Sequence, residues 1–181
     1  MDLRDKLANP ASIRYIDKLV LEVYEQPDTF PILFQLIFDA DMKVAWKAAW
    51  ACDKISEKTP DWFSSSHFDQ LCKLLLQTNH SGLQRGCLST LLNLPLPEEL
   101  SVDFINFCFE SMISPKSAIA VQALSMKMLL RLSQKEPDFT LELKAYLENI
   151  DVNCYSAGFI ATRKNTLKVL NKMKLGERVD K

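Results

Sequence analysis

Apolar side chains recur along almost the whole chain at the spacing of one face of an α-helix. In residues 12–26, for example, Ile16, Leu19 and Val23 follow one another at intervals of three and four, which matches the helical period of about 3.6 residues. Ser12 stands just before this pattern and is a preferred N-cap residue. The pattern therefore predicts an amphipathic helix, and it resumes after each short break.

The breaks divide the chain into helices of similar length. Proline stands at or near most of the helix starts, where its missing N–H costs nothing, and the chain contains only four glycines. Strict alternation of Val, Ile and Thr, which would indicate strands, is absent. We expect helices at residues 12–26, 28–39, 41–58, 67–78, 81–94, 98–113, 115–135, 137–151 and 155–173. Their short connections predict antiparallel pairs, with 1–26 as an N-terminal cap and 174–181 as a flexible tail.

The second helix of each pair carries a recurring pattern. The segments "VAWKAAWACDK", "GLQRGCLSTLL", "IAVQALSMKML" and "FIATRKNTLKVL" align without gaps and share a polar residue followed by a small or short one. The polar residues are Lys47, Arg85, Gln122 and Lys164, and the following residues are Ala48, Gly86, Ala123 and Asn165. The latter are 38, 37 and 42 residues apart. A small residue allows two helices to approach closely.

This pattern resembles the two-helix repeats of HEAT-like and armadillo-type proteins, whose period is about 40–47 residues. The resemblance covers roughly residues 12–173. It implies an all-α fold, an α-α superhelix or HEAT-like solenoid of about four to five helix pairs. We therefore expect a single HEAT-like domain over residues 1–173. In such solenoids the first helices usually line the convex face and the second helices the concave face.

Charge is distributed unequally between these two sets of helices, although the net charge is only −1. The expected first helices are net acidic and the second helices net basic. The arrangement predicts a basic concave groove that would attract acidic partners. Charges that favour helix ends contribute to the same asymmetry, so a merely solvated basic face is the alternative. Seven basic residues remain unexplained by helix ends: Lys47, Arg85, Lys127, Arg131, Arg163, Lys164 and Lys168.

Trp46 and Trp50 lie one turn apart on the helix expected at 41–58. A helix inside a solenoid contacts both its partner and the next repeat, so the two rings can form a second buried face. Alternatively, they line the groove near Lys47 and stack on a base, an extended peptide or a cation. The sequence leaves both interpretations open.

Signatures of catalysis or cofactor binding are missing from the sequence. It contains no glycine-rich phosphate loop, no G-x-S-x-G and no H-E-x-x-H. The five cysteines form no C-x-x-C, and only His67 and His80 are present, both near expected helix starts. We therefore expect no metal, no cofactor and reduced thiols in a cytoplasmic protein. No signal peptide and no transmembrane helix are expected either.

Two enzyme families share partial features with the chain. Some small bacterial helical-repeat proteins of this size carry the name adenylosuccinate lyase, and "SMISPKSA" at 111–118 superficially resembles the mobile serine loop of that enzyme. Here the segment is interpreted as a turn between paired helices. HEAT-like alkylpurine DNA glycosylases use tryptophans and an aspartate in a basic groove, and Trp46, Trp50 and Asp53 are loosely similar. In that family, however, the tryptophan and the aspartate are four residues apart, whereas Trp50 and Asp53 are three apart.

The sequence favours a non-catalytic binding or scaffold module. Its basic concave groove would bind an acidic protein or peptide, and nucleic acid is the alternative partner. No membrane association is expected. The candidate binding residues are Trp46, Lys47, Trp50, Arg85, Gln122, Arg163 and Lys164.

Overall fold

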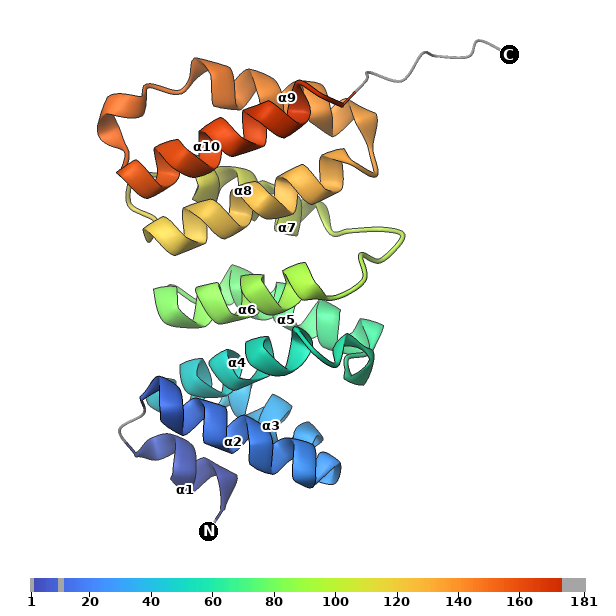
Figure 1. Cartoon of the computed structure of the whole chain (residues 1–181), viewed down its shortest axis with the longest axis vertical. Helices are drawn as coiled ribbons and strands as arrows, with labels where there is room; N and C mark the ends of the chain where they lie inside the picture. Colours follow the sequence, from blue (N-terminus) through green and yellow to red (C-terminus); the bar gives the residue numbers. More distant parts are fainter. Residues whose placement is uncertain (1, 10–11, 174–181) are drawn as a thin grey trace. The chain divides into compact units, whose positions relative to one another are not determined.

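Helices account for nearly all the regular structure of the protein (Figure 1). The computed structural model describes residues 2–9 and 12–173, and this part of the chain contains no β-strand. The tail predicted at 174–181 lies outside the described residues. The chain divides into two compact units, Met1–Glu99 (unit 1) and Leu100–Lys181 (unit 2), which are described separately here.

The described residues of unit 1 form six α-helices and three short 3₁₀ helices. In chain order they are α1 (Leu3–Ala8), α2 (Ile13–Glu25), η1 (Pro27–Thr29), α3 (Phe30–Gln35), η2 (Leu36–Phe38), α4 (Met42–Ser56), η3 (Pro60–Trp62), α5 (Ser65–Gln77) and α6 (Ser81–Asn93). The helices α2, α4 and α6 form one layer, with α3 and α5 behind them (Figure 1). At the centre α4 packs mainly against α6, and also against α1, α2 and η2.

Side-chain caps fix the starts of several helices in unit 1. Ser12 accepts a hydrogen bond from the N–H of Tyr15, and Asp41 accepts one from the N–H of Lys43. The cap at Ser12 was predicted from the sequence and is confirmed. The two histidines act in the same way, because His67 Nδ1 accepts from Ser64 N–H and His80 Nδ1 accepts from Leu83 N–H. Each cap satisfies a backbone donor that the helix itself leaves unpaired.

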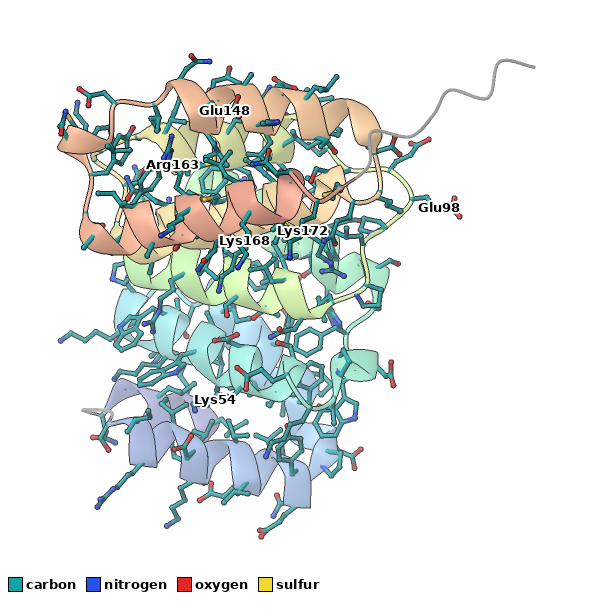
Figure 2. The ribbon with its side chains drawn as sticks, turned by 45° about the horizontal axis from the view of Figure 1, so that its top comes forward. Lys54, Glu98, Glu148, Arg163, Lys168 and Lys172 are labelled. Carbon is teal, nitrogen blue, oxygen red and sulfur yellow. The ribbon has the colours of Figure 1, made fainter. Side chains whose placement is uncertain are left out.

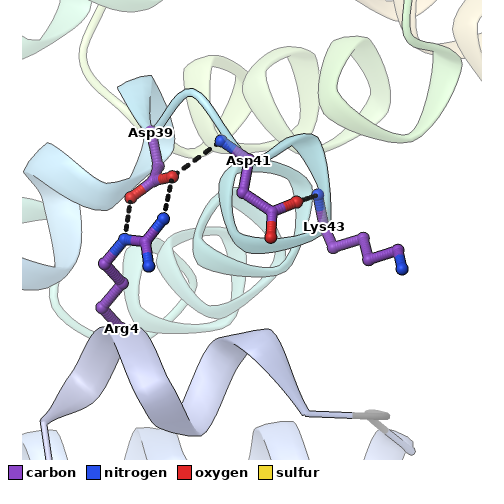
Figure 3. Close-up of polar contacts among 4 residues, drawn as sticks. All are labelled: Arg4, Asp39, Asp41 and Lys43. Atoms are coloured by element: carbon purple, nitrogen blue, oxygen red, sulfur yellow. Dashed lines mark hydrogen bonds and ion pairs between the residues drawn. The ribbon is translucent and has the colours of Figure 1, made fainter.

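The N-terminal cap differs from the single helix expected at 12–26, because residues 3–8 also form a helix, α1. An ion pair ties α1 to the turn before α4 (Figure 3). Arg4 Nε lies 2.7 Å from Asp39 Oδ2, and Asp39 also accepts a bond of 2.8 Å from the N–H of Asp41. The Arg4 guanidinium, together with that N–H, lowers the pKa of the Asp39 carboxyl.

Close packing between α4 and α6 depends on a missing side chain. A Cβ atom placed on Gly86 would lie 2.8 Å from the Cβ of Ala49 and 3.1 Å from its carbonyl carbon. The predicted function of the small residue in the repeat pattern is thus confirmed at Gly86. It does not hold at Asn165, which is exposed to solvent.

The described residues of unit 2 form four α-helices and one 3₁₀ helix: α7 (Val102–Ile113), α8 (Ile119–Ser133), α9 (Pro137–Asn149), η4 (Val152–Cys154) and α10 (Ala157–Leu170). The helix α8 packs against α7, α9 and α10. Within the unit, α8 and α10 form one layer and α7 and α9 the other (Figure 1). The core between the layers includes Phe104, Met112, Met126, Leu143 and Phe159, all fully buried.

The class predicted from the sequence, an all-α helical-repeat fold, is confirmed. Consecutive helices pair and stack within each unit, as the repeat pattern requires. None of the helices in the described part of the chain has the length and apolar character needed to span a membrane.

Candidate binding surfaces

Lys47, predicted as a groove residue, is buried inside unit 1. Only 5% of its surface is exposed, and its Nζ donates hydrogen bonds to the carbonyl oxygens of Leu7 and Asn9, at 2.7 and 2.6 Å. Burial lowers the pKa of its ammonium group. The side chain satisfies the orphan carbonyls at the end of α1, so it has a structural function here, and a contact between Lys47 and a ligand stays a prediction.

Gln122 has the same structural role in unit 2. Its side chain is 3% exposed, and its Nε2 donates a bond of 2.7 Å to the carbonyl oxygen of Ser114, the C-cap of α7. Gln122 therefore also has a structural function, and its predicted contact with a ligand stays a prediction. In both repeats, the polar residue identified by aligning the four helical segments donates a hydrogen bond to a backbone carbonyl of a neighbouring segment.

Arg163 is half-buried at the end of α9 (Figure 2). Its Nε donates a bond of 2.5 Å to the carbonyl oxygen of Leu147, and its Nη2 lies 3.5 Å from that of Glu148. A cation at a helix C-terminus also complements the negative end of the helix dipole. Arg163 thus stabilises the packing of α10 on α9, and its guanidinium is engaged by the carbonyls at the end of α9.

The remaining aligned residues, Arg85 and Lys164, are exposed. In their helices the residue one position earlier has the structural role. Gln84 of α6 donates to the carbonyl of Thr78, the C-cap of α5, and Arg163 of α10 donates to that of Leu147 in α9. This shift by one residue frees the side chains of Arg85 and Lys164 for solvent.

Trp46 and Trp50 form a stacked pair at the edge between α4 and α6. Their ring centroids are 5.9 Å apart with an interplanar angle of 15°, and both side chains are half-buried. The guanidinium carbon of Arg85 lies 5.9 Å from the centre of the Trp50 ring, which is cation–π distance. Both sequence interpretations therefore apply in part, because the rings contact α6 and also reach solvent.

Asp53 lies one turn beyond Trp50 and has an unusual environment. Its Oδ1 is buried and accepts no hydrogen bond from the described residues. Burial raises the pKa of the carboxyl, while the hydroxyl of Ser89 and the charge of Arg85 act in the opposite direction. The positions of Trp50, Asp53, Arg85 and Ser89 bring a carboxyl, a cation and an indole together on one edge of unit 1.

Two of the four basic side chains on α4 and α6 make polar contacts within unit 1. Lys47 is buried, and Lys54 forms an ion pair with Asp17 of α2, with Nζ 2.8 Å from Oδ1. Lys54 is labelled in Figure 2. The basic groove predicted from charge counts is consequently weaker over this unit than the sequence suggests.

Unit 2 separates its charges more sharply. Every charged side chain on α8 and α10 is basic, whereas α7 carries only acids and α9 carries three acids and Lys144. Lys127, Lys164 and Lys168 are exposed, and burial lowers the pKa of Arg131. Lys168 and Lys172 follow one another along and just beyond α10 (Figure 2). We call Lys127, Lys164, Lys168 and Lys172 the basic face of unit 2.

The predicted site residues are thus divided between the units. Trp46, Trp50 and Arg85 come together in unit 1, while Lys164 belongs to the basic face of unit 2. A single groove that joins them stays a prediction. Lys127 and Lys168 are not among the site residues predicted from the sequence. The structure adds them to the basic face because both are exposed on helices that carry no acidic residue.

Residues 2–9 and 12–173 contain no group of three or more His, Cys, Asp or Glu side chains arranged to hold a metal ion. Four of the cysteines are buried, and burial raises the pKa of the Cys72 thiol to about 12. Cys154 is exposed in η4.

Comparison with known proteins identifies one related family. The family model described as HEAT repeat domain matches residues 3–170 of this chain. No curated protein and no solved structure matches the chain.

Proposed function

Because the chain belongs to the HEAT repeat domain family, we propose that it is a non-catalytic protein-interaction module. HEAT repeats typically mediate contacts between proteins. In this proposal the basic face of unit 2 binds an acidic segment of a partner protein.

One observation carries the proposal: α8 and α10 pack side by side and carry no acidic residue. Lys164 and Lys168 lie one turn apart on α10, and like charges at this spacing repel by about 0.2–0.5 kcal/mol per pair. An acidic ligand removes this repulsion and gains attraction, so the face favours anionic partners.

The spacing of the lysines suits a peptide. Lys164 and Lys168 are four residues apart on α10, which corresponds to about 6 Å along the axis. Alternate residues of an extended chain are separated by about 6.6 Å. Acidic side chains at every second position of an extended segment would therefore meet successive lysines.

Fluorescence anisotropy of a labelled glutamate-rich peptide tests the proposal. We expect the full-length chain to bind the peptide with an affinity that falls as salt screens the exposed charges, and the double variant Lys164→Glu, Lys168→Glu to lose most of it. The matched control reverses two exposed lysines of unit 1, Lys18→Glu and Lys73→Glu. Equal loss in both double variants, or binding that does not depend on salt, would reject the proposal.

A second candidate function, nucleic-acid binding, is favoured by the Trp46–Trp50 stack with Arg85 beside it. Exposed aromatic faces next to a cation are suited to stack on bases of a single strand. Titration with a single-stranded oligonucleotide should then quench tryptophan fluorescence at low salt, and Arg85→Glu should reduce the effect. Absence of quenching at low salt removes this candidate.

A third candidate function, an activity similar to that of alkylpurine DNA glycosylases, is supported by the same edge of unit 1, where Asp53 lies near Trp50 and Arg85. This activity would release alkylated bases from DNA and would be abolished in Asp53→Asn. A wild-type protein that releases none ends this alternative.

A further inference from the structure

Unit 2 contains a hollow on the layer opposite its basic face. Its volume is ≈ 570 Å³, and it lies where α9 ends and η4 begins, beside the last residue of α7. Ligand pockets typically have about 300–1,000 Å³, so the hollow is large enough for a long side chain. Nothing in the proposed function uses this region.

The walls of the hollow combine aliphatic groups with two tyrosine rings. Ile113, Ala145 and Ile150 contribute the aliphatic surface, and Tyr146 and Tyr155 contribute the rings. The ring of Tyr146 packs against Phe109 at a centroid distance of 5.2 Å, yet 43% of the Tyr146 surface remains exposed. Contacts therefore hold the ring in place while leaving part of it available.

Tyr155 is also held in a fixed orientation. Its ring stacks on Phe159 with centroids 4.1 Å apart, and its hydroxyl donates a hydrogen bond to the carbonyl oxygen of Ile113. Because the hydroxyl proton is engaged in this bond, Tyr155 can contact a ligand through the apolar and π surface of its ring.

The electrostatic character of the hollow is negative. Among the described residues, no lysine, arginine or histidine lines it, and Asp151 contributes a carboxylate. The side chain of Asp151 is oriented by bonds that Oδ1 accepts from the N–H and the Nδ2 of Asn153, at 3.1 and 2.9 Å. The helix α7 ends here without a basic residue in its last turn, so its dipole adds negative potential. The dipole of α9 is already complemented by Arg163, which donates to the carbonyl of Leu147.

Acidic residues continue along the two helices that lead to the hollow. Glu142 precedes Tyr146 by four residues on α9, and Glu110 precedes Ile113 by three on α7, so each lies on the same helix face as a wall residue. Both are exposed. Arg163 already donates to carbonyls of the last turn of α9, which shows that this helix end accepts a guanidinium.

We propose that this hollow receives a lysine or arginine side chain from a basic segment of a partner protein. The aliphatic walls cover the methylene stem, the tyrosine rings attract the cationic head, and Asp151 pairs with its charge. Glu110 and Glu142 attract further basic residues of the same segment. Unit 2 would then bind segments of opposite charge on its two layers.

Amide chemical shifts of the ¹⁵N-labelled full-length chain test this inference with two probe peptides, acetyl-Leu-Arg-Leu-amide and acetyl-Leu-Glu-Leu-amide. The arginine peptide should shift the amides of Ala145, Tyr146 and Ile150, and the glutamate peptide should not. Asp151→Asn keeps the oxygen that bonds Asn153, and it should weaken binding about threefold to fivefold, the effect of losing one exposed ion pair. Asp103→Asn, at the other end of α7, is the matched control and should change nothing.

Three results would overturn the inference: equal shifts at Ala145, Tyr146 and Ile150 with both peptides, shifts by the arginine peptide confined to other residues, or unchanged affinity of the arginine peptide for Asp151→Asn. Titration with butylamine tests whether a small amine alone binds the hollow. If it binds at these residues as tightly as the arginine peptide, the hollow is a site for a small amine and the inference of a protein partner is wrong. Binding of the glutamate peptide to the basic face would shift amides of α8 and α10, so the result at Ala145, Tyr146 and Ile150 is independent of the proposed function.

Discussion

Three long polar side chains in this protein use their reach to satisfy backbone carbonyls. Lys47, Gln122 and Arg163 each bond a carbonyl at the end of a neighbouring helix. Such carbonyls have no partner within their own helix, and leaving them unpaired away from water is costly. A polar residue that recurs at the repeat period therefore has a structural cause here, before any ligand is considered.

Replacement of Lys47 by methionine should destabilise unit 1. The substitution keeps a similar apolar stem but leaves the carbonyls of Leu7 and Asn9 without their donor. Loss of hydrogen bonds from a charged group costs about 1.5–3 kcal/mol, which urea unfolding would measure. Lys43→Met is the matched control on the same helix, where the side chain is exposed, and a change within about 0.5 kcal/mol is expected. Equal effects of both substitutions would contradict the structural function of Lys47.

His67 predicts a specific pH dependence. Its Nδ1 accepts the N–H of Ser64, its ring lies 4.2 Å from that of Phe34, and burial lowers its pKa below the ordinary value. Because the folded-state pKa is lowered, the neutral ring of His67 stabilises the folded protein fully at pH values above the unfolded pKa of about 6.5. This stabilisation is lost as the pH falls through the folded-state pKa, because the protonated ring cannot accept that bond.

His67→Gln separates this effect from other titrations. Glutamine at the third helical position preserves the capping box with Ser64 but does not titrate. Unfolding free energies measured from pH 7.5 to 5.5, a range of about 1 unit on either side of the histidine value, should fall more for the wild type than for the variant. Identical slopes would exclude His67 as a source of the pH dependence.

At the scale of elements, the apolar period and the breaks between segments predict the helices well. The cores of α2, α4, α6 and α8 lie where the sequence places them. The expected helix at 28–39 is instead divided into η1, α3 and η2, and α1 was not predicted because six residues show too little of a period. The sequence could not predict that the side chains of Lys47 and Gln122 are buried, because the backbone carbonyls that they bond belong to other segments of the chain.

Charge counts predicted the basic helices, but the count alone does not show which charges reach solvent. Lys54 contributes to the count and is paired with Asp17, whereas Lys164 contributes equally and is exposed. The stacking of Trp46 on Trp50 could be anticipated from their spacing of one turn. The position of Arg85 beside them depends on the register between α4 and α6, which tertiary packing sets.

Gly86→Ala tests the close approach of α4 and α6. The added Cβ would meet the Cβ and the backbone of Ala49, and overpacking of this kind costs about 1–3 kcal/mol, more than the gain of about 1 kcal/mol from helix propensity. Thermal unfolding should show a lower Tm. At Gly158 the nearest atom is the Cγ2 of Ile119, at 3.3 Å, and this side chain can adjust. Gly158→Ala should be neutral or stabilising, and a greater loss there than at Gly86 would contradict the packing argument.

Over the whole molecule, a net charge of −1 conceals a local separation of charge. Unit 1 engages two of the four basic side chains on α4 and α6 in internal polar contacts, and unit 2 exposes lysines on one layer and acids on the other. Such a separation favours partners of defined sign on each surface without affecting the overall charge. The family match over residues 3–170 agrees with a protein that acts through contacts with other proteins.

The most direct test of the central claim is to map where an acidic ligand binds on the full-length, ¹⁵N-labelled chain. On titration with a glutamate-rich peptide, amide shifts should concentrate on α8 and α10, around Lys127, Lys164 and Lys168, and the double variant Lys164→Glu, Lys168→Glu should remove them. Shifts centred on α7 and α9, or spread evenly over unit 1 and unit 2, would contradict the claim.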